Sequence, residues 1–200
     1  MSSLILASSS VYKKMLMERL QIEFKCQAPA IDESQHKNEL PSEMAVRLAE
    51  QKALAIARKF PNAIVIGADQ VGELEGQVLG KPHNYQSAVA QLRAQSGRTS
   101  KFHCGISVVQ QLTNNKIIKR TRINTTEVSF RDLQQQQIDN YLLSDQPYDC
   151  AGSFKAEGLG ISLFTAVKSN DPSSLVGLPL IELCSILAEF GVHINNNRLK

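Results

Sequence analysis

The most informative charged residue of this 200-residue chain is Lys52, because its neighbours have the spacing of a helix. At 100° per residue it falls at the centre of an apolar arc formed by Ala45, Leu48, Ala49 and Ile56. A lysine inside an apolar arc must either extend its ammonium group to solvent or bind an anion. The spacing predicts one of these two arrangements and does not choose between them.

Asp69 follows the apolar run 63–68, which is typical of a buried strand ending at this carboxylate. Ligands of open α/β sheets gather at the carboxyl ends of strands. The small residues Gly67 and Ala68 would let other groups approach the carboxylate closely. The position also fits an aspartate in a turn before the hairpin predicted over 71–79, so a ligand-binding role and a turn role both stay open.

Two segments offer groups that bind phosphate. Ser8, Ser9 and Ser10 stand between a predicted short strand and a predicted helix. Hydroxyl groups and free backbone N–H groups point the same way at such a helix start, which is typical of an anion site. Lys81 lies in the rigid turn Gly-Lys-Pro. Taken alone, Lys81 is equally typical of an exposed loop lysine.

Two other loops carry acidic groups. Asp32 and Glu33 form an acidic pair after a predicted strand, and such oxygen ligands suit Mg²⁺ or Mn²⁺, although acidic surface loops are common. Residues 153–158 combine an aromatic ring, a cation and a carboxylate within a Gly-bounded loop. That set could recognise the edge of a nucleobase, or it could form a plain surface loop.

Composition and missing motifs exclude several classes of protein. The net charge of +3 is too small for a nucleic-acid binder. The four cysteines are too far apart for a zinc site or a disulfide framework, so reduced, mostly buried thiols are expected. The sequence has no signal peptide and no run of 18 apolar residues, which predicts a cytoplasmic protein without a membrane span. Motifs of P-loop, Rossmann, zincin and serine-hydrolase enzymes are lacking, and no role is assigned to the four histidines.

The residues above lie on or between predicted strands and helices that alternate along the chain. This alternation indicates an α/β fold. Strands are predicted at 4–7, 22–30, 63–68, 101–112, 116–129 and 162–167, and helices at 11–20, 41–60, 84–96 and 134–143. A last helix is predicted to start at Asp171-Pro172. Ser42, Asn84 and Asp132 are the expected N-caps of the middle helices, with Gly97 ending the third. The hairpin in the middle predicts a mixed sheet rather than a purely parallel one.

The order of the short motifs is more specific than any one of them. LASSSVYKKML, IDES, RLAEQKA, VIGADQV, GKP, AGSFKAEGLG and DPSSLVGLPL follow one another over about residues 4–187. In this order the chain resembles the Maf family of nucleotide pyrophosphatases. The resemblance implies a mixed, elongated, twisted sheet flanked by helices, with two lobes around a central cleft. It also implies a single domain over residues 1–200, without a separate linker.

The resemblance implies roles for individual residues. The family pattern L-A-S-x-S-P-R-R places Ser8 and Ser10 at its serines, and Lys13 replaces its second arginine, keeping the charge without the planar fork. The phosphate-binding residues implied are Ser8, Ser10, Lys13, Lys52 and Lys81. Asp69 matches the family's proton acceptor, and Glu33 and Asp69 are the implied ligands of a divalent metal, Mg²⁺ or Mn²⁺.

Three further positions suggest which nucleotide is preferred. The family members that prefer dTTP and UTP have arginine, threonine and glutamine where this chain has Tyr12, Gln70 and Glu157. An aromatic residue, glutamine and glutamate at these positions resemble the branch that acts on 7-methyl-GTP. N7-methylated guanine carries a positive charge, which an aromatic face attracts and a carboxylate favours.

The implied function is hydrolysis of 7-methyl-GTP to 7-methyl-GMP and pyrophosphate, as house-cleaning of modified nucleotides. The alternatives are a dTTP/UTP or broader non-standard nucleotide pyrophosphatase, and a non-catalytic nucleotide sensor that regulates cell division. The expected partner is a nucleoside triphosphate rather than a nucleic acid or a membrane. A homodimer is suggested by the family alone.

Overall fold

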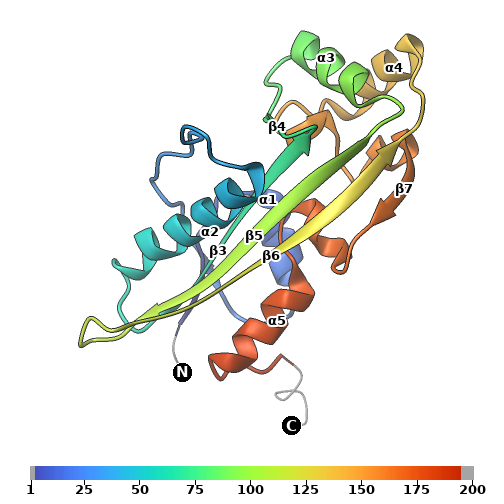
Figure 1. Ribbon diagram of the computed structural model, residues 1–200. Helices are drawn as coiled ribbons and strands as arrows, with labels where there is room; N and C mark the ends of the chain where they lie inside the picture. Colours follow the sequence, from blue (N-terminus) through green and yellow to red (C-terminus); the bar gives the residue numbers. More distant parts are fainter. Residues whose placement is uncertain (1–2, 195–200) are drawn as a thin grey trace.

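One mixed sheet of seven strands organises the computed structural model, which describes residues 3–194 (Figure 1). The strands are β1 (Leu4–Leu6), β2 (Lys25–Cys26), β3 (Ile64–Leu74), β4 (Gln77–Leu79), β5 (Thr99–Gln111), β6 (Ile117–Phe130) and β7 (Phe164–Lys168). Their order is β2-β1-β3-β5-β6-β7, with β4 paired to β3. Only β1 pairs in parallel, with β2 and β3, and the other pairs are antiparallel.

Helices cover both faces of this sheet. They are α1 (Val11–Glu18), α2 (Pro41–Ala57), α3 (Tyr85–Gln95), α4 (Gln135–Asp145) and α5 (Leu180–Glu189), with short 3₁₀ helices η1 (Ala151–Ser153), η2 (Leu159–Leu163) and η3 (Pro172–Val176). In Figure 1, α2 and α5 lie on opposite sides of the long strands, and α3 and α4 lie beyond one end. No helix within residues 3–194 is long and apolar enough to cross a membrane.

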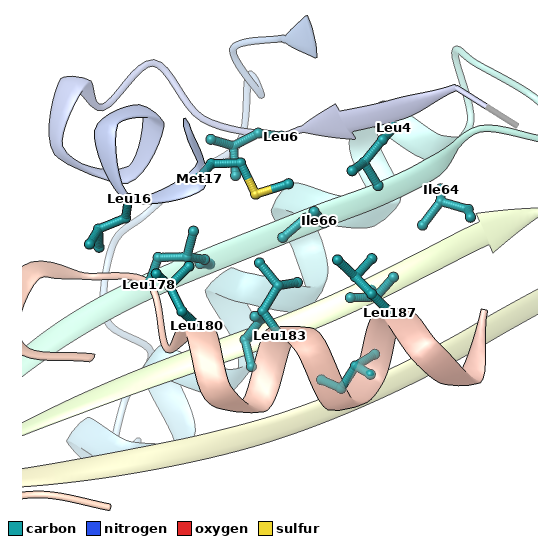
Figure 2. Packing of buried hydrophobic residues seen from close by; sticks show 14 residues of the cluster. Leu4, Leu6, Leu16, Met17, Ile64, Ile66, Leu178, Leu180, Leu183 and Leu187 are labelled. Carbon is teal, nitrogen blue, oxygen red and sulfur yellow. The ribbon is translucent and has the colours of Figure 1, made fainter. Parts of the chain in front are cut away.

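Alternating side chains of β3 form two different core surfaces. Ile64 and Ile66 pack toward α5, where Leu183 and Leu187 project onto β3 and β1 (Figure 2). Val65, between these isoleucines, packs on the opposite face with residues of α2. This period-2 alternation sends consecutive residues of β3 to different faces of the sheet, a pattern that continues to the functional residues.

A second core lies at the other end of the sheet, under α3 and α4. Phe102, Phe130, Phe154 and Phe164 meet edge to face, with ring centroids 4.9–5.8 Å apart. Edge-to-face pairs add to the stabilisation that burial alone gives. Because Phe154 belongs to the segment 151–158, this core fixes that segment against the sheet.

The mixed α/β architecture and most elements match the sequence-based expectations. Asn84 caps α3 by accepting a hydrogen bond from the Ser87 N–H (2.8 Å), and Gly97 follows the helix with a φ of 67°. The predicted hairpin turns at Glu75-Gly76, where both residues have positive φ. Positive φ at both central residues is the geometry that a two-residue hairpin turn requires.

Several predicted boundaries are wrong. Within the strand predicted at 22–30, only Lys25–Cys26 forms a strand, because only these two residues pair with β1. The strand predicted to end at 68 runs to Leu74, because β5 pairs with β3 beyond Asp69. The last helix is interrupted at Gly177 (φ 111°), giving η3 and then α5.

Two expected caps and one burial expectation are also wrong. Leu40, not Ser42, is the N-cap of α2, since Pro41 already occupies the first helical position. Gln134, not Asp132, is the N-cap of α4. All four cysteines are free thiols as expected, but only Cys104 is buried and Cys26 is exposed.

Candidate active site

The candidate site lies where one edge of β3 lacks a strand neighbour. β1 pairs with β3 as far as Ile66, and β4 begins to pair at Gly72. Among the described residues no strand covers 67–71 on this edge, and Asp69 and Gln70 lie in that interval. A cleft of about 720 Å³ opens there, a volume typical of small-molecule sites.

The ten residues to which the family resemblance assigns roles all line this one cleft, whereas Asp32, the other member of the predicted acidic pair, does not line it. The ten are Ser8, Ser10, Tyr12, Lys13, Glu33, Lys52, Asp69, Gln70, Lys81 and Glu157. They come from α1 and its N-terminal loop, the loop before α2, α2 itself, β3, the turn after β4 and the segment after η1. The fold therefore brings together residues that are up to 149 positions apart in the sequence, from Ser8 to Glu157.

Two glycines let α2 approach the sheet closely enough to deliver Lys52. A Cβ atom at Gly67 would lie 2.2 Å from the backbone oxygen of Ala49. A Cβ atom at Gly105 would lie 2.3 Å from the backbone oxygen of Ala45. Both distances are far below van der Waals contact, so neither strand position tolerates a side chain with α2 in place.

Lys52 binds two carboxylates at the centre of the site. Its Nζ lies 2.5 Å from Oδ1 of Asp69 and 2.9 Å from Oε1 of Glu33. Lys52 is 8% exposed and Asp69 is 9% exposed, whereas Glu33 is exposed. Burial opposes the ammonium charge, but the two carboxylates outweigh it and raise the pKa of Lys52 above its ordinary value. The predicted anion-binding alternative for Lys52 is thus the one that forms.

The loop before α1 presents two hydroxyl groups to the cleft. Ser8 Oγ accepts a hydrogen bond from the Ser10 N–H (3.0 Å), and Ser10 Oγ accepts one from the Lys13 N–H (3.4 Å) as N-cap of α1. Each hydroxyl thus uses its oxygen as an acceptor and keeps its own O–H as a donor. Donors at a helix N-terminus are suited to phosphate oxygens.

Lys13 adds a cation with no ion-pair partner in the described part of the chain. Burial lowers the pKa of its ammonium group, Asp69 opposes this, and the nearby charges of Lys52 and Lys81 lower it further. The three lysines thus outnumber the two carboxylates of Glu33 and Asp69, and this excess of positive charge is suited to a polyanion.

The same cleft also holds Tyr12, Gln70 and Glu157. Burial, followed by interactions with Cys150, Asp149 and Glu157, raises the pKa of Tyr12 to about 12. The phenol therefore stays neutral at physiological pH. The Gln70 amide donates to the backbone oxygens of Ser174 and Leu175, both at 2.9 Å.

Sequence reasoning missed two cleft residues, and it did not predict that η3, which lies within the quoted motif DPSSLVGLPL, contacts Gln70. Asp149 and Cys150 line the cleft beside Tyr12, and burial raises the pKa of the Cys150 thiol to about 12. η3 supports Gln70 from more than 100 positions away in the sequence. The spacing of residues along the sequence does not reveal contacts between segments so far apart. The sequence around Asp149 does not distinguish it from other loop aspartates.

The oxygen donors fit a divalent cation that arrives with phosphate ligands. Glu33 and Asp69 lie close to each other, since both bind the ammonium group of Lys52. Within residues 3–194 no group of three or more His, Cys, Asp or Glu side chains could form a protein-only metal cage. Mg²⁺ commonly uses one or two carboxylates, with waters and substrate phosphates completing its shell.

Taken together, the fold and the cleft define an α/β protein built to bind a phosphorylated small molecule next to a buried carboxylate. The comparisons with known proteins are more specific. Residues 3–190 match the family described as Maf-like protein, so the chain belongs to the Maf family.

Two relatives named 7-methyl-GTP pyrophosphatase are similar over nearly their whole length. The protein of Colwellia psychrerythraea is 43% identical over 97% of this chain and 96% of its own length. The protein of Xanthomonas oryzae pv. oryzae is 48% identical over 97% of this chain and 100% of its own length. The solved structure of a HAM1 protein from Coxiella burnetii aligns with 94% of this chain and 100% of its own, at 18% identity and a TM-score of 0.49.

Proposed function

We propose that this chain hydrolyses 7-methyl-GTP to 7-methyl-GMP and pyrophosphate, clearing modified nucleotides from the cytoplasm. The observation that carries the proposal is the single cleft that holds Lys13, Lys52 and Asp69 together with Tyr12 and Glu157. The relatives that bear this activity in their names support the same conclusion.

The triphosphate binds along the cationic side of the cleft. Ser8 and Ser10 donate their free O–H groups to phosphate oxygens, and Lys13, Lys52 and Lys81 neutralise the negative charge. Fixed donors and cations of this kind stabilise charge as it develops in phosphoryl transfer, and they also position the α-phosphorus.

Asp69 accepts the proton of the attacking water. The water oxygen bonds to the α-phosphorus, the bond from that phosphorus to the α–β bridging oxygen breaks, and pyrophosphate leaves with the bond's electron pair. Glu33 and Asp69 would hold Mg²⁺ or Mn²⁺, which when bound neutralises phosphate charge and makes water more acidic. Lys52 holds Asp69 in place through their ion pair, so the carboxylate is oriented before substrate arrives.

The base binds at the other side of the cleft. The neutral ring of Tyr12 attracts the cationic 7-methylguanine through its π face. Glu157 is exposed in the cleft and accepts from the N–H groups of the guanine edge. A carboxylate also favours a cationic base over a neutral one, which is the physical basis for preferring 7-methyl-GTP to GTP.

A nucleotide panel tests this proposal. Pyrophosphate release is measured with Mg²⁺ and 7-methyl-GTP, GTP, dTTP, UTP or ITP, before and after removal of the metal by EDTA. We expect the highest kcat/KM with 7-methyl-GTP and loss of activity with EDTA. A preference for dTTP and UTP, or equal rates across the panel, would establish the alternative pyrophosphatase functions. Nucleotide binding without any pyrophosphate release would establish the sensor.

The organisation of the molecule is part of the same proposal. We propose that the two ends of the sheet act as two lobes of one domain spanning the chain, with the cleft between them. A single cooperative unfolding transition, followed by fluorescence and circular dichroism, is the expected result. A homodimer in solution is also proposed, and sedimentation equilibrium measures it directly.

A further inference from the structure

The amide group of Gln70 is held in one orientation by the backbone of η3. Its Nε2 lies 2.9 Å from the oxygen of Ser174 and 2.9 Å from the oxygen of Leu175. An amide nitrogen has two N–H donors and a backbone oxygen can only accept, so both donors are used. The reversed orientation would place the amide oxygen against two carbonyl oxygens.

The oxygen of the same amide is left for the ligand. Gln70 lines the cleft, and its Oε1 has no hydrogen-bond partner in the described part of the chain. Among the described residues only the Oγ of Ser174 is a buried side-chain oxygen or nitrogen without a partner, so Gln70 Oε1 is open to the cleft. Gln70 therefore presents an acceptor, and not a donor, to whatever binds there.

A buried carboxylate holds η3 in the position that this contact requires. Asp171 is 1% exposed, and its carboxylate accepts four hydrogen bonds. Its Oδ1 accepts from the N–H (3.2 Å) and hydroxyl (2.6 Å) of Ser173, at the start of η3. Its Oδ2 accepts from the N–H groups of Ile181 (2.7 Å) and Glu182 (3.3 Å), in the first turn of α5. One side chain thus ties η3 to the following helix.

We propose that Asp171 is a positioning residue for base selection: it fixes η3, whose carbonyl groups turn the Gln70 amide so that its oxygen faces the base. The proposal rests on the proposed function, because it identifies which group of the base the site requires. Gln70 Oε1 and the Glu157 carboxylate are both acceptors, so the bound edge must offer N–H groups. The Watson–Crick edge of guanine does so through N1–H and its exocyclic amine.

The orientation of Gln70 can be tested without any substrate. In the wild-type protein we expect the side-chain amide protons of Gln70 to exchange with solvent at least 10-fold more slowly than those of Gln136. Gln136 is exposed and has no hydrogen-bond partner in the described chain, so it is a matched control. Equal exchange rates of the two amides overturn the proposal, whatever nucleotide the enzyme prefers.

The role of Asp171 is tested by Asp171→Asn, which keeps the shape of the side chain but replaces one acceptor oxygen by a donor. We expect faster exchange of the Gln70 amide and a roughly 10-fold lower kcat/KM for 7-methyl-GTP, the effect of losing about one hydrogen bond. The Ki of tripolyphosphate, which reports on the phosphate side alone, should change less than twofold. Asp139→Asn, at an aspartate of α4 that accepts hydrogen bonds from Tyr85 of α3 and from Gln135 of its own helix, is the control and should change neither quantity.

A double-mutant cycle separates positioning from general damage. In a Gln70→Ala background, Asp171→Asn should cost less than twofold in kcat/KM, because the residue it positions is gone. An equal loss in both backgrounds, or a matching loss of tripolyphosphate affinity, shows a purely structural role and overturns the proposal. Should Asp171→Asn fail to fold, the milder Ser173→Ala must show the same pattern with a smaller effect. If 7-methyl-GTP is not a substrate at all, the proposed function fails, while the exchange experiment still decides the orientation of Gln70.

Discussion

Replacing Asp69 by asparagine separates the chemical role of this carboxylate from its structural role. The asparagine oxygen can still accept a hydrogen bond from Lys52, and Lys52 keeps its ion pair with Glu33 at 2.9 Å. The substitution therefore exchanges a hydrogen bond between two charged groups for one between a charged donor and a neutral acceptor, a loss of about 1 kcal/mol in unfolding free energy. For a chain of 200 residues this is roughly 2–4 °C in Tm.

The expected catalytic effect of Asp69→Asn is far larger. Loss of a general base typically lowers kcat by about 10²–10⁴-fold, which corresponds to roughly 2.7–5.4 kcal/mol in the activation barrier. The assay is pyrophosphate release at saturating 7-methyl-GTP with Mg²⁺, alongside thermal unfolding of the same samples. Asp139→Asn removes a charge from a hydrogen-bonded aspartate outside the cleft and should keep wild-type kcat. A kcat of Asp69→Asn within threefold of wild type would falsify the assignment of Asp69 as proton acceptor.

Three other perturbations test the electrostatics, the selectivity and the packing of the site. Burial lowers the pKa of Lys13, so between that pKa and the ordinary value of about 10.4 the unfolded chain binds more protons. The unfolding free energy should therefore rise with pH in this window, and urea titrations should show that Lys13→Met abolishes the rise. The triple variant Tyr12→Arg, Gln70→Thr and Glu157→Gln should shift the preference toward dTTP and UTP, and an unchanged preference in the nucleotide panel contradicts our specificity assignment. Gly67→Ala places a Cβ atom 2.2 Å from a backbone oxygen of α2, so it should lower the unfolding free energy by about 3 kcal/mol or more; a normal Tm would disprove this tight contact.

A candidate functional residue could be predicted from the sequence where its type conflicts with the local pattern around it. Lys52 is a charged residue on the apolar face of a predicted helix, and such a conflict between residue type and local pattern often marks a functional site. The structure resolves that conflict with two carboxylates on the same ammonium group. The order of the short motifs then connected Lys52 with residues that carry no such signal, including Lys81 and Glu157.

The remaining features depend on tertiary contacts that no local pattern contains. Asp69 was expected at the end of a strand, yet β3 continues because β5 pairs with it beyond Asp69, from Gln70 with Cys104 to Glu73 with Lys101. The last helix was expected to start at Asp171, yet Gly177 interrupts it. Asp171 is therefore the N-cap of η3 and also accepts a hydrogen bond from the first turn of α5. The hydrogen bonds of Gln70 to η3 follow from this interruption, because the oxygens of Ser174 and Leu175 lie near the end of η3 rather than inside a continuous helix. The Ser174 oxygen accepts from the Gly177 N–H (2.9 Å) as well as from Gln70.

The interrupted edge of β3 explains how one strand serves two tasks. Consecutive residues of a strand point to opposite faces, so Asp69 meets Lys52 from α2 while Gln70 meets η3 on the other side. In a sheet with both edges paired, these two side chains would be separated by the sheet and could not contact one ligand. Because β1 ends at Leu6 and β4 begins to pair only at Gly72, the ligand can lie across the open edge. Under the proposed function, two neighbouring residues of β3 would thus serve the chemical step and the choice of base, one supported by α2 and the other by η3.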